Sequence, residues 1–167
     1  MTTAERATDP EARLQHALDL SYRYLGFRDR TVLEVRRHLE SKRVEPDTIE
    51  QTVAELLAQG YLDDARFARR FVEDRRALDD WGNERIERKL LASGVDGDLA
   101  QAALHAPTTD TGNAVQSQFD AALATLQRRF RVPPESDRDR ERALGFLVRK
   151  GYELEVAYDA IRAYGRD

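Results

Sequence analysis

Three short segments of this sequence decide its fold: Leu39-Glu40-Ser41-Lys42-Arg43-Val44, Leu90-Leu91-Ala92-Ser93-Gly94-Val95 and Leu147-Val148-Arg149-Lys150-Gly151-Tyr152. Each segment begins with a leucine, runs to a predicted helix end and closes on an apolar residue. Leu90 lies 51 residues after Leu39, and Leu147 lies 57 residues after Leu90. This spacing predicts tandem repeats, because one unit of about fifty residues buries little apolar surface by itself and stacks on its neighbours.

Each repeat is predicted to contain three helices, since apolar residues recur every three or four positions. Thr31 and Glu34 have the spacing of a capping box, and Pro46 suits a first helical position. Asn83 suits an N-cap, and Gly94 suits the end of a helix. No alternating pattern of useful length indicates a strand. The predicted fold class is therefore all-α, with three tandem three-helix repeats forming an elongated, curved molecule.

The predicted domains are a flexible N-terminal tail at 1–11 and three repeats at 12–60, 61–107 and 108–167. Pro107 to Gly112 is expected to link the second and third repeats, and Pro133-Pro134 to separate two helices of the third. The alternative is a single compact bundle in which similar amphipathic helices recur by coincidence.

The composition of the chain excludes several classes of function. The chain has 167 residues, 27 Lys plus Arg against 31 Asp plus Glu, a net charge of -4 and no cysteine. The absence of cysteine excludes disulfides, thiolate metal sites and a cysteine nucleophile, and it fits a reducing cytoplasm. The first ten residues lack a signal-peptide apolar region, and no window is long enough for a membrane helix. We expect a cytoplasmic protein with no membrane contact, and the acidic balance is unlike that of a dedicated DNA-binding domain.

No motif supports catalysis. The three histidines, His16, His38 and His105, lack the spacing of a zinc site, and the glycines form no phosphate-binding loop. Asp63-Asp64 precedes a predicted helix and is expected to cap it, whereas Asp79-Asp80 precedes a turn. The sequence therefore predicts no enzyme activity, no catalytic residue, no metal site and no cofactor.

Clustered arginines are the more informative feature. One predicted helix carries Arg66, Arg69, Arg70, Arg75 and Arg76, the next carries Arg85, Arg88 and Lys89, and Arg149-Lys150 lies in the third repeat. Neighbours three or four positions apart share a helix surface, so the middle repeat is expected to carry a cationic ridge. Two interpretations remain open: a solvated face balanced by nearby carboxylates, or a surface for acidic protein or nucleic-acid backbone. Trp81 is expected to plug a space between repeats rather than to be exposed.

The middle repeat resembles the RecX family of bacterial recombinase regulators. The resemblance runs from Gly60-Tyr61-Leu62-Asp63-Asp64-Ala65-Arg66-Phe67-Ala68 through Gly82, Ile86 and Leu90 to Gly94-Val95. Its structural signature comprises Asp63, Asp64, Phe67, Phe71, Gly82, Ile86, Leu90 and Gly94. Similar segments in the first repeat, Ala17-Leu18 through Leu39, and in the third, Arg142-Ala143 through Ile161, extend it over most of 12–163. Three departures stand out: Arg43 occupies a helix end where the family commonly has glycine, the insert-like Ala77-Leu78-Asp79-Asp80-Trp81 lengthens a turn, and residues 108–118 and 131–137 match poorly.

The resemblance implies a monomeric regulator, typically an inhibitor, of the RecA recombinase. Such a protein binds in the groove of the RecA–DNA filament and modulates ATP hydrolysis, strand exchange and filament growth or disassembly, as part of DNA repair and the SOS response. Weak contact with single- or double-stranded DNA is compatible with this role. The expected partner-binding residues are Arg66, Arg69, Arg70, Arg75, Arg76, Arg85, Arg88, Lys89, Arg149 and Lys150. The alternatives are a direct DNA-binding helical module and a helical-repeat protein–protein adaptor.

Overall fold

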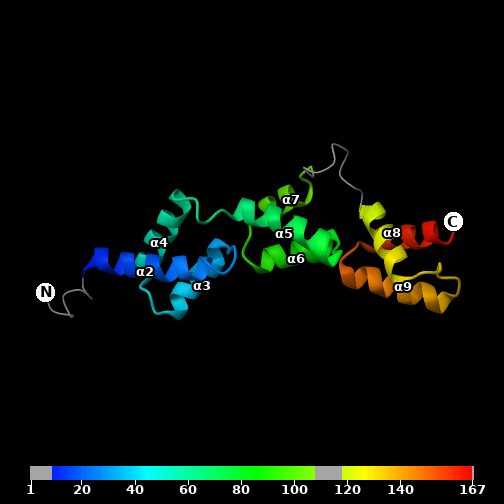
Figure 1. Cartoon of the computed structure of the whole chain (residues 1–167), viewed down its shortest axis with the longest axis horizontal. Helices are drawn as coiled ribbons and strands as arrows, with labels where there is room; N and C mark the ends of the chain where they lie inside the picture. The colour runs from blue at the N-terminus through cyan, green and yellow to red at the C-terminus, as the bar shows by residue number, and fades with distance from the viewer. Residues whose placement is uncertain (1–8, 108–117, 167) are drawn as a thin grey trace. The chain divides into compact units, whose positions relative to one another are not determined.

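The computed structural model describes residues 9–107 and 118–166, and every helix in these ranges is an α-helix (Figure 1). The helices are α2 (Pro10–Leu25), α3 (Val32–Ser41), α4 (Pro46–Ala58), α5 (Asp64–Asp79), α6 (Asn83–Ala92), α7 (Gly97–Leu104), α8 (Gln118–Arg129), α9 (Asp137–Lys150) and α10 (Leu154–Tyr164). No strand occurs within the described residues, which confirms the all-α prediction. Most of the predicted tail and of the linker that follows Pro107 lie outside those ranges.

The described chain divides into two compact units, and the division falls inside α5. The first unit contains residues 9–67 together with 93–96, and the second contains residues 68–92 and 97–166. In the first unit α2 packs against α3 and α4, and its core is built by Ala17, Leu18, Val35, Leu39, Ile49, Val53, Leu56 and Leu62.

The beginnings of the first-unit helices follow from local sequence. The Thr31 hydroxyl accepts a hydrogen bond from the backbone N of Glu34, and the Glu34 carboxylate accepts one from the backbone N of Thr31. This reciprocal pair satisfies two amides that a helix start leaves without partners, so the predicted capping box is confirmed. Pro46 occupies the start of α4, also as predicted, because its fixed φ and missing N–H suit that position.

The three aligned segments, 39–44, 90–95 and 147–152, share one backbone feature. Arg43, Gly94 and Gly151 all have left-handed φ, at 61°, 86° and 97°. Two of these ends also share a hydrogen bond that closes the last turn, from the backbone N of Val44 to the Leu39 carbonyl oxygen and from that of Tyr152 to the Leu147 carbonyl oxygen. The predicted register between repeats therefore holds in the backbone itself.

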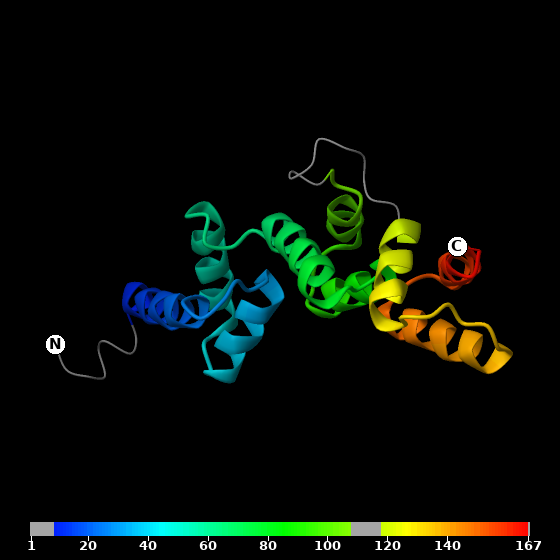
Figure 2. The same ribbon diagram turned by 45° about the vertical axis from the view of Figure 1, so that its right-hand side comes forward.

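In the second unit α6 packs against α7, and α10 packs against α8 and α9 (Figures 1 and 2). The third-repeat core contains Ala122, Leu126, Ala143, Leu147, Tyr152, Ala157, Ala160, Ile161 and Tyr164. Ile86 and Leu90, two residues of the family signature, are fully buried, and Phe67, a third, is 8% exposed in the first unit. Leu78, in the last turn of α5, has a side chain that is 73% exposed.

Two predicted helix starts need correction. The Gly82 carbonyl oxygen accepts a hydrogen bond from the backbone N of Ile86, so Gly82 rather than Asn83 occupies the N-cap position of α6. Asp63 caps α5 as expected, because its carboxylate accepts a hydrogen bond from the backbone N of Arg66. The carboxylate of Asp64 instead accepts a hydrogen bond from the backbone N of Val32, so it caps the start of α3. Burial of this carboxyl raises the pKa of Asp64.

Candidate functional site

The arginines of α5 divide into internal and external groups. Arg76 is internal: its Nη2 donates to the Asn83 Oδ1 at 2.9 Å and to the Leu104 carbonyl oxygen at 2.8 Å. These bonds connect α5 with the start of α6 and the end of α7. Burial lowers the pKa of Arg76 from its ordinary value, since an apolar environment disfavours the charged form. Arg76 therefore stabilises the packing of the middle-repeat helices instead of facing a partner.

Trp81 holds two further arginines of the predicted ridge. The Cζ of Arg85 lies 4.0 Å from the centre of the Trp81 ring, and that of Arg75 lies 5.7 Å from it. The ring of Phe71 packs edge-on against the same indole. Arg75 also forms a 2.5 Å ion pair with Asp79, so both guanidinium groups are partly occupied within the protein. The contacts of Trp81 come from α5 and α6, whereas the sequence predicted a plug between repeats.

Arg69, Arg88 and Lys89 form the external group, which we call the free cations. All three are exposed, and within the described residues none has an ion pair or a side-chain hydrogen bond. Arg70 is also exposed but has an interaction of its own. Arg66 lies in the first unit, where its Nη2 donates to the Gly60 carbonyl oxygen at 2.9 Å.

The contact between the second and third repeats uses residues that sequence analysis assigned to other roles. The backbone N of Gly82 donates to the Lys150 carbonyl oxygen at 2.8 Å, and that of Glu84 donates to the Gly151 carbonyl oxygen at 3.0 Å. Arg85 Nη1 donates to the Arg149 carbonyl oxygen at 3.0 Å. The start of α6 therefore lies at the end of α9, and the positive end of the α6 dipole faces the Lys150 and Gly151 carbonyl groups.

The insert Asp79-Asp80-Trp81 belongs to the same contact. Lys150 Nζ donates to the Asp79 carbonyl oxygen at 2.8 Å, and the Tyr152 hydroxyl donates to the Asp80 carbonyl oxygen at 3.2 Å. The Asp80 carboxylate also pairs with Arg128 of α8 at 2.5 Å. No local sequence signal predicts these contacts, because their partners lie 48 to 72 residues apart. Lys150 is partly engaged here, while Arg149 keeps an exposed side chain.

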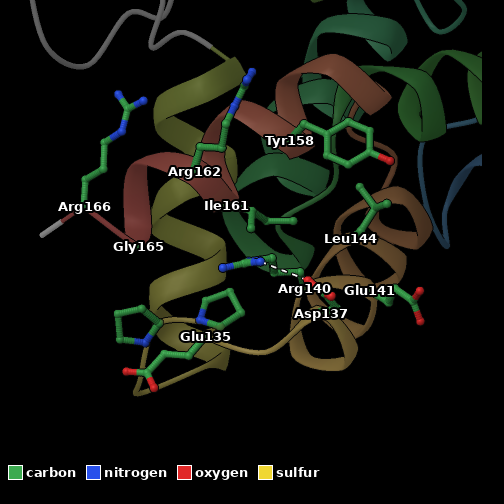
Figure 3. Close-up of a pocket in the computed structure, with 12 residues that line it drawn as sticks. Glu135, Asp137, Arg140, Glu141, Leu144, Tyr158, Ile161, Arg162, Gly165 and Arg166 are labelled. Atoms are coloured by element: carbon green, nitrogen blue, oxygen red, sulfur yellow. Dashed lines mark hydrogen bonds and ion pairs between the residues drawn. The ribbon is translucent and has the colours of Figure 1, made fainter.

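A hollow lies between α9 and α10, and no sequence motif predicted it. We call it the third-repeat hollow; its volume is about 800 Å³. Figure 3 shows apolar side chains on its floor and charged side chains along its edges. Its lining residues are Pro133, Pro134, Glu135, Asp137, Arg140, Glu141, Leu144, Tyr158, Ile161, Arg162, Gly165 and Arg166.

Three sequence matches decide the family. The first, second and third three-helix domains of RecX match residues 17–56, 63–104 and 116–161. The chain belongs to the RecX family. Each RecX match falls on one group of three helices: α2 to α4, α5 to α7, and α8 to α10.

Curated RecX relatives share the chain over most of its length. Regulatory protein RecX from Mycolicibacterium smegmatis is 32% identical, over 94% of this chain and 84% of that protein. RecX from a strain of Lactobacillus delbrueckii subsp. bulgaricus is 40% identical over 86% of this chain. The chain spans only 63% and 64% of the length of the relatives from two strains of that bacterium.

Solved RecX structures share the fold. The crystal structure of RecX from Lactobacillus salivarius matches with a TM-score of 0.77 at 21% identity, covering 93% of this chain and 98% of that one. A second RecX crystal structure matches with a TM-score of 0.72 at 22% identity, covering 92% of this chain and 73% of that one.

In the described ranges of this RecX chain, no helix has the length and hydropathy needed to cross a bilayer. The same ranges contain no cluster of acidic and histidine side chains arranged to hold a metal ion.

Proposed function

We propose that this RecX protein regulates the RecA recombinase by binding in the groove of the RecA–DNA filament, most simply as an inhibitor of ATP hydrolysis and strand exchange. The observation that carries the proposal is the match of three successive RecX domains to one chain whose relatives are named regulatory proteins. The protein would act as a monomer in the cytoplasm, by occupying a surface rather than by catalysis.

The free cations are the proposed contact points. Arg69, Arg88 and Lys89 are exposed and lack acidic partners in the described part of the chain, so they keep their full charge for a partner. Arg75, Arg76 and Arg85 would contribute indirectly, since their guanidinium groups hold α5, α6 and Trp81 in place. We expect the energy of binding to be concentrated in a few of these residues rather than spread evenly.

The first test is the ATPase rate of RecA from the same organism on single-stranded DNA, titrated with this protein. Strong inhibition well below one molecule per recombinase would indicate filament capping or disassembly, whereas inhibition only at stoichiometric amounts would indicate groove occupancy. No change in ATPase rate together with no filament binding would refute the proposal.

The second test reverses the charge of Arg88 and Lys89. The double variant Arg88→Glu with Lys89→Glu should weaken filament binding while leaving the melting temperature nearly unchanged, because both side chains are exposed. A control variant, Arg13→Glu with Arg138→Glu, makes the same change of net charge at exposed positions on α2 and α9. Equal binding by the two variants would remove α6 from the contact surface.

Salt dependence separates filament binding from direct binding to DNA. If the protein binds mainly phosphate, log affinity falls by about 0.9 per neutralised phosphate for each tenfold rise in salt. A mainly protein interface gives a smaller slope. We expect the smaller slope with the filament and weak binding to DNA alone.

A further inference from the structure

The third-repeat hollow includes two positions that are polar in the first two repeats and are occupied by leucine and tyrosine in the third. The register of the repeats aligns Arg36, Glu87 and Leu144 on the middle helices, at separations of 51 and 57 residues. It aligns Glu50, Gln101 and Tyr158 on the third helices in the same way.

In the first repeat this pair of positions closes the groove between helices with an ion pair. Arg36 Nε and Nη2 donate to the two carboxylate oxygens of Glu50, each at 3.0 Å. In the second repeat Gln101 Nε2 donates to Glu87 Oε1 at 2.7 Å. The middle and third helices are thus bridged by polar side chains in both repeats.

The third repeat has no such bridge. Leu144 and Tyr158 stand at the equivalent positions, and together with Ile161 they form an apolar floor. Tyr158 is 49% exposed, and Leu154, one turn before it on α10, is 55% exposed. The first two repeats cover these positions with a polar bridge, whereas the third leaves apolar surface exposed to water. Exposed apolar patches of this kind mark interaction sites.

In Figure 3, Arg162 of α10 and Arg166, which follows that helix, lie at one edge of the hollow, and Glu135 and Glu141 lie at the other, with the Arg140–Asp137 ion pair between them. Arg162 pairs with Asp159, but Arg166, Glu135 and Glu141 have no ion pair or side-chain hydrogen bond within the described residues. A partner must therefore combine an apolar centre with a basic flank and an acidic flank. Nucleic acid fits poorly, because the free carboxylates repel phosphate and the floor offers it only the Tyr158 hydroxyl as a donor.

We propose that the third-repeat hollow receives the apolar face of an amphipathic helix of a partner protein. Basic side chains of that helix face Glu135 and Glu141, and an acidic one faces Arg166. A helix laid in a groove buries side chains three and four positions apart, which suits a floor formed by α9 and α10. The inference rests on the proposed function, in which the regulated recombinase supplies this helix.

The decisive variant restores the polar bridge. Leu144→Arg with Tyr158→Glu copies the Arg36–Glu50 ion pair of the first repeat into the third, so it seals the hollow with a pair that the same fold already accepts. The control is Tyr61→Ser, a change at a tyrosine of similar exposure, 56%, in the first unit. Binding to RecA filaments on single-stranded DNA is measured by co-sedimentation, and far-UV circular dichroism and thermal melting check that each variant is folded.

Removal of a central aromatic contact should weaken filament binding by about tenfold or more, while the control binds like the wild type. Equal binding by the folded double variant would overturn the proposal and leave the proposed function intact. Failure of the wild type to bind filaments would overturn both.

A second variant identifies the occupant without depending on the bridge. Tyr158 is replaced by the photo-crosslinker p-benzoylphenylalanine, and the cross-linked peptides are identified by mass spectrometry with RecA filaments as the probe. Attachment to the apolar face of a RecA helix would support the proposal. Attachment to DNA, to a second copy of this chain, or to a RecA loop would overturn it.

Discussion

Replacing Gly82 with alanine is expected to lower the free energy of unfolding of the second unit by about 2–4 kcal/mol. An alanine Cβ would lie 2.5 Å from the carbonyl carbon of Gly151 and 2.5 Å from the backbone N of Tyr152. Both neighbours are backbone atoms, so no side-chain rotation can relieve the overlap. Gly82 does not have a positive φ, and the cost therefore comes from space rather than from backbone strain.

The magnitude follows from what the overlap displaces. Two backbone hydrogen bonds hold this contact, from Gly82 N to the Lys150 carbonyl oxygen and from Glu84 N to that of Gly151. Each contributes about 0.5–1.5 kcal/mol, and an extra methyl group in a tightly packed site costs about 1–3 kcal/mol. Alanine returns roughly 0.4–1 kcal/mol by restricting the unfolded chain. The full range of the net loss is then about 1–5 kcal/mol, and the stated 2–4 kcal/mol is its centre.

Urea unfolding followed by fluorescence and far-UV circular dichroism measures the effect. Trp81 is the single tryptophan and stands next to the substitution, so its emission reports this contact directly. The control is Gly145→Ala inside α9, where the added Cβ meets only the flexible end of Arg149, 2.9 Å away at Nη1. The control should raise stability by up to about 1 kcal/mol. A Gly82→Ala protein as stable as the wild type would refute the close-contact argument.

Three further predictions concern single side chains. Arg43→Gly should raise the free energy of unfolding by about 1 kcal/mol in urea, because Arg43 occupies a left-handed conformation that favours glycine. Phe67→Ala should lower it by about 3–5 kcal/mol in the same assay, since the ring is 8% exposed and its loss leaves a cavity. Burial, Lys42 and Arg30 lower the pKa of His38 from 6.5. Removing the nearby charge in Lys42→Met should therefore raise the His38 pKa in an NMR titration. The wild type should lose stability as the pH falls from 6.5 through the lowered pKa, because the unfolded chain binds the proton first.

Local signals in the sequence predicted much of the fold correctly. The Thr31–Glu34 capping box, Pro46 and the helix end at Gly94 depend on residues a few positions apart, and each forms as predicted. Arg43, which stands where the family commonly has glycine, nevertheless takes up the left-handed conformation, so this departure leaves the helix end unaltered. These features are readable because their physical causes lie within one or two helical turns.

The candidate site was less predictable. The helical spacing of the arginines correctly placed them on α5 and α6, but the spacing is the same for Arg76, which bonds internally, and Arg69, which is exposed. The third-repeat hollow had no motif at all. The only sequence feature that accompanies it is the change from a polar pair to Leu144 and Tyr158. This change can be interpreted only when the structure shows that the equivalent polar pairs form bonds in the first and second repeats.

The sequence by itself determined the helices, most of their ends and the threefold repetition, because apolar periodicity, caps and left-handed glycines act within short stretches of chain. Tertiary structure alone decided which cations are free, that Asp64 caps a helix distant in sequence, and that the Asp79–Gly82 segment latches onto the end of α9. Whether a charged side chain is buried or paired depends on atoms that folding brings close to it. The number of residues between two positions does not give their distance in the folded protein.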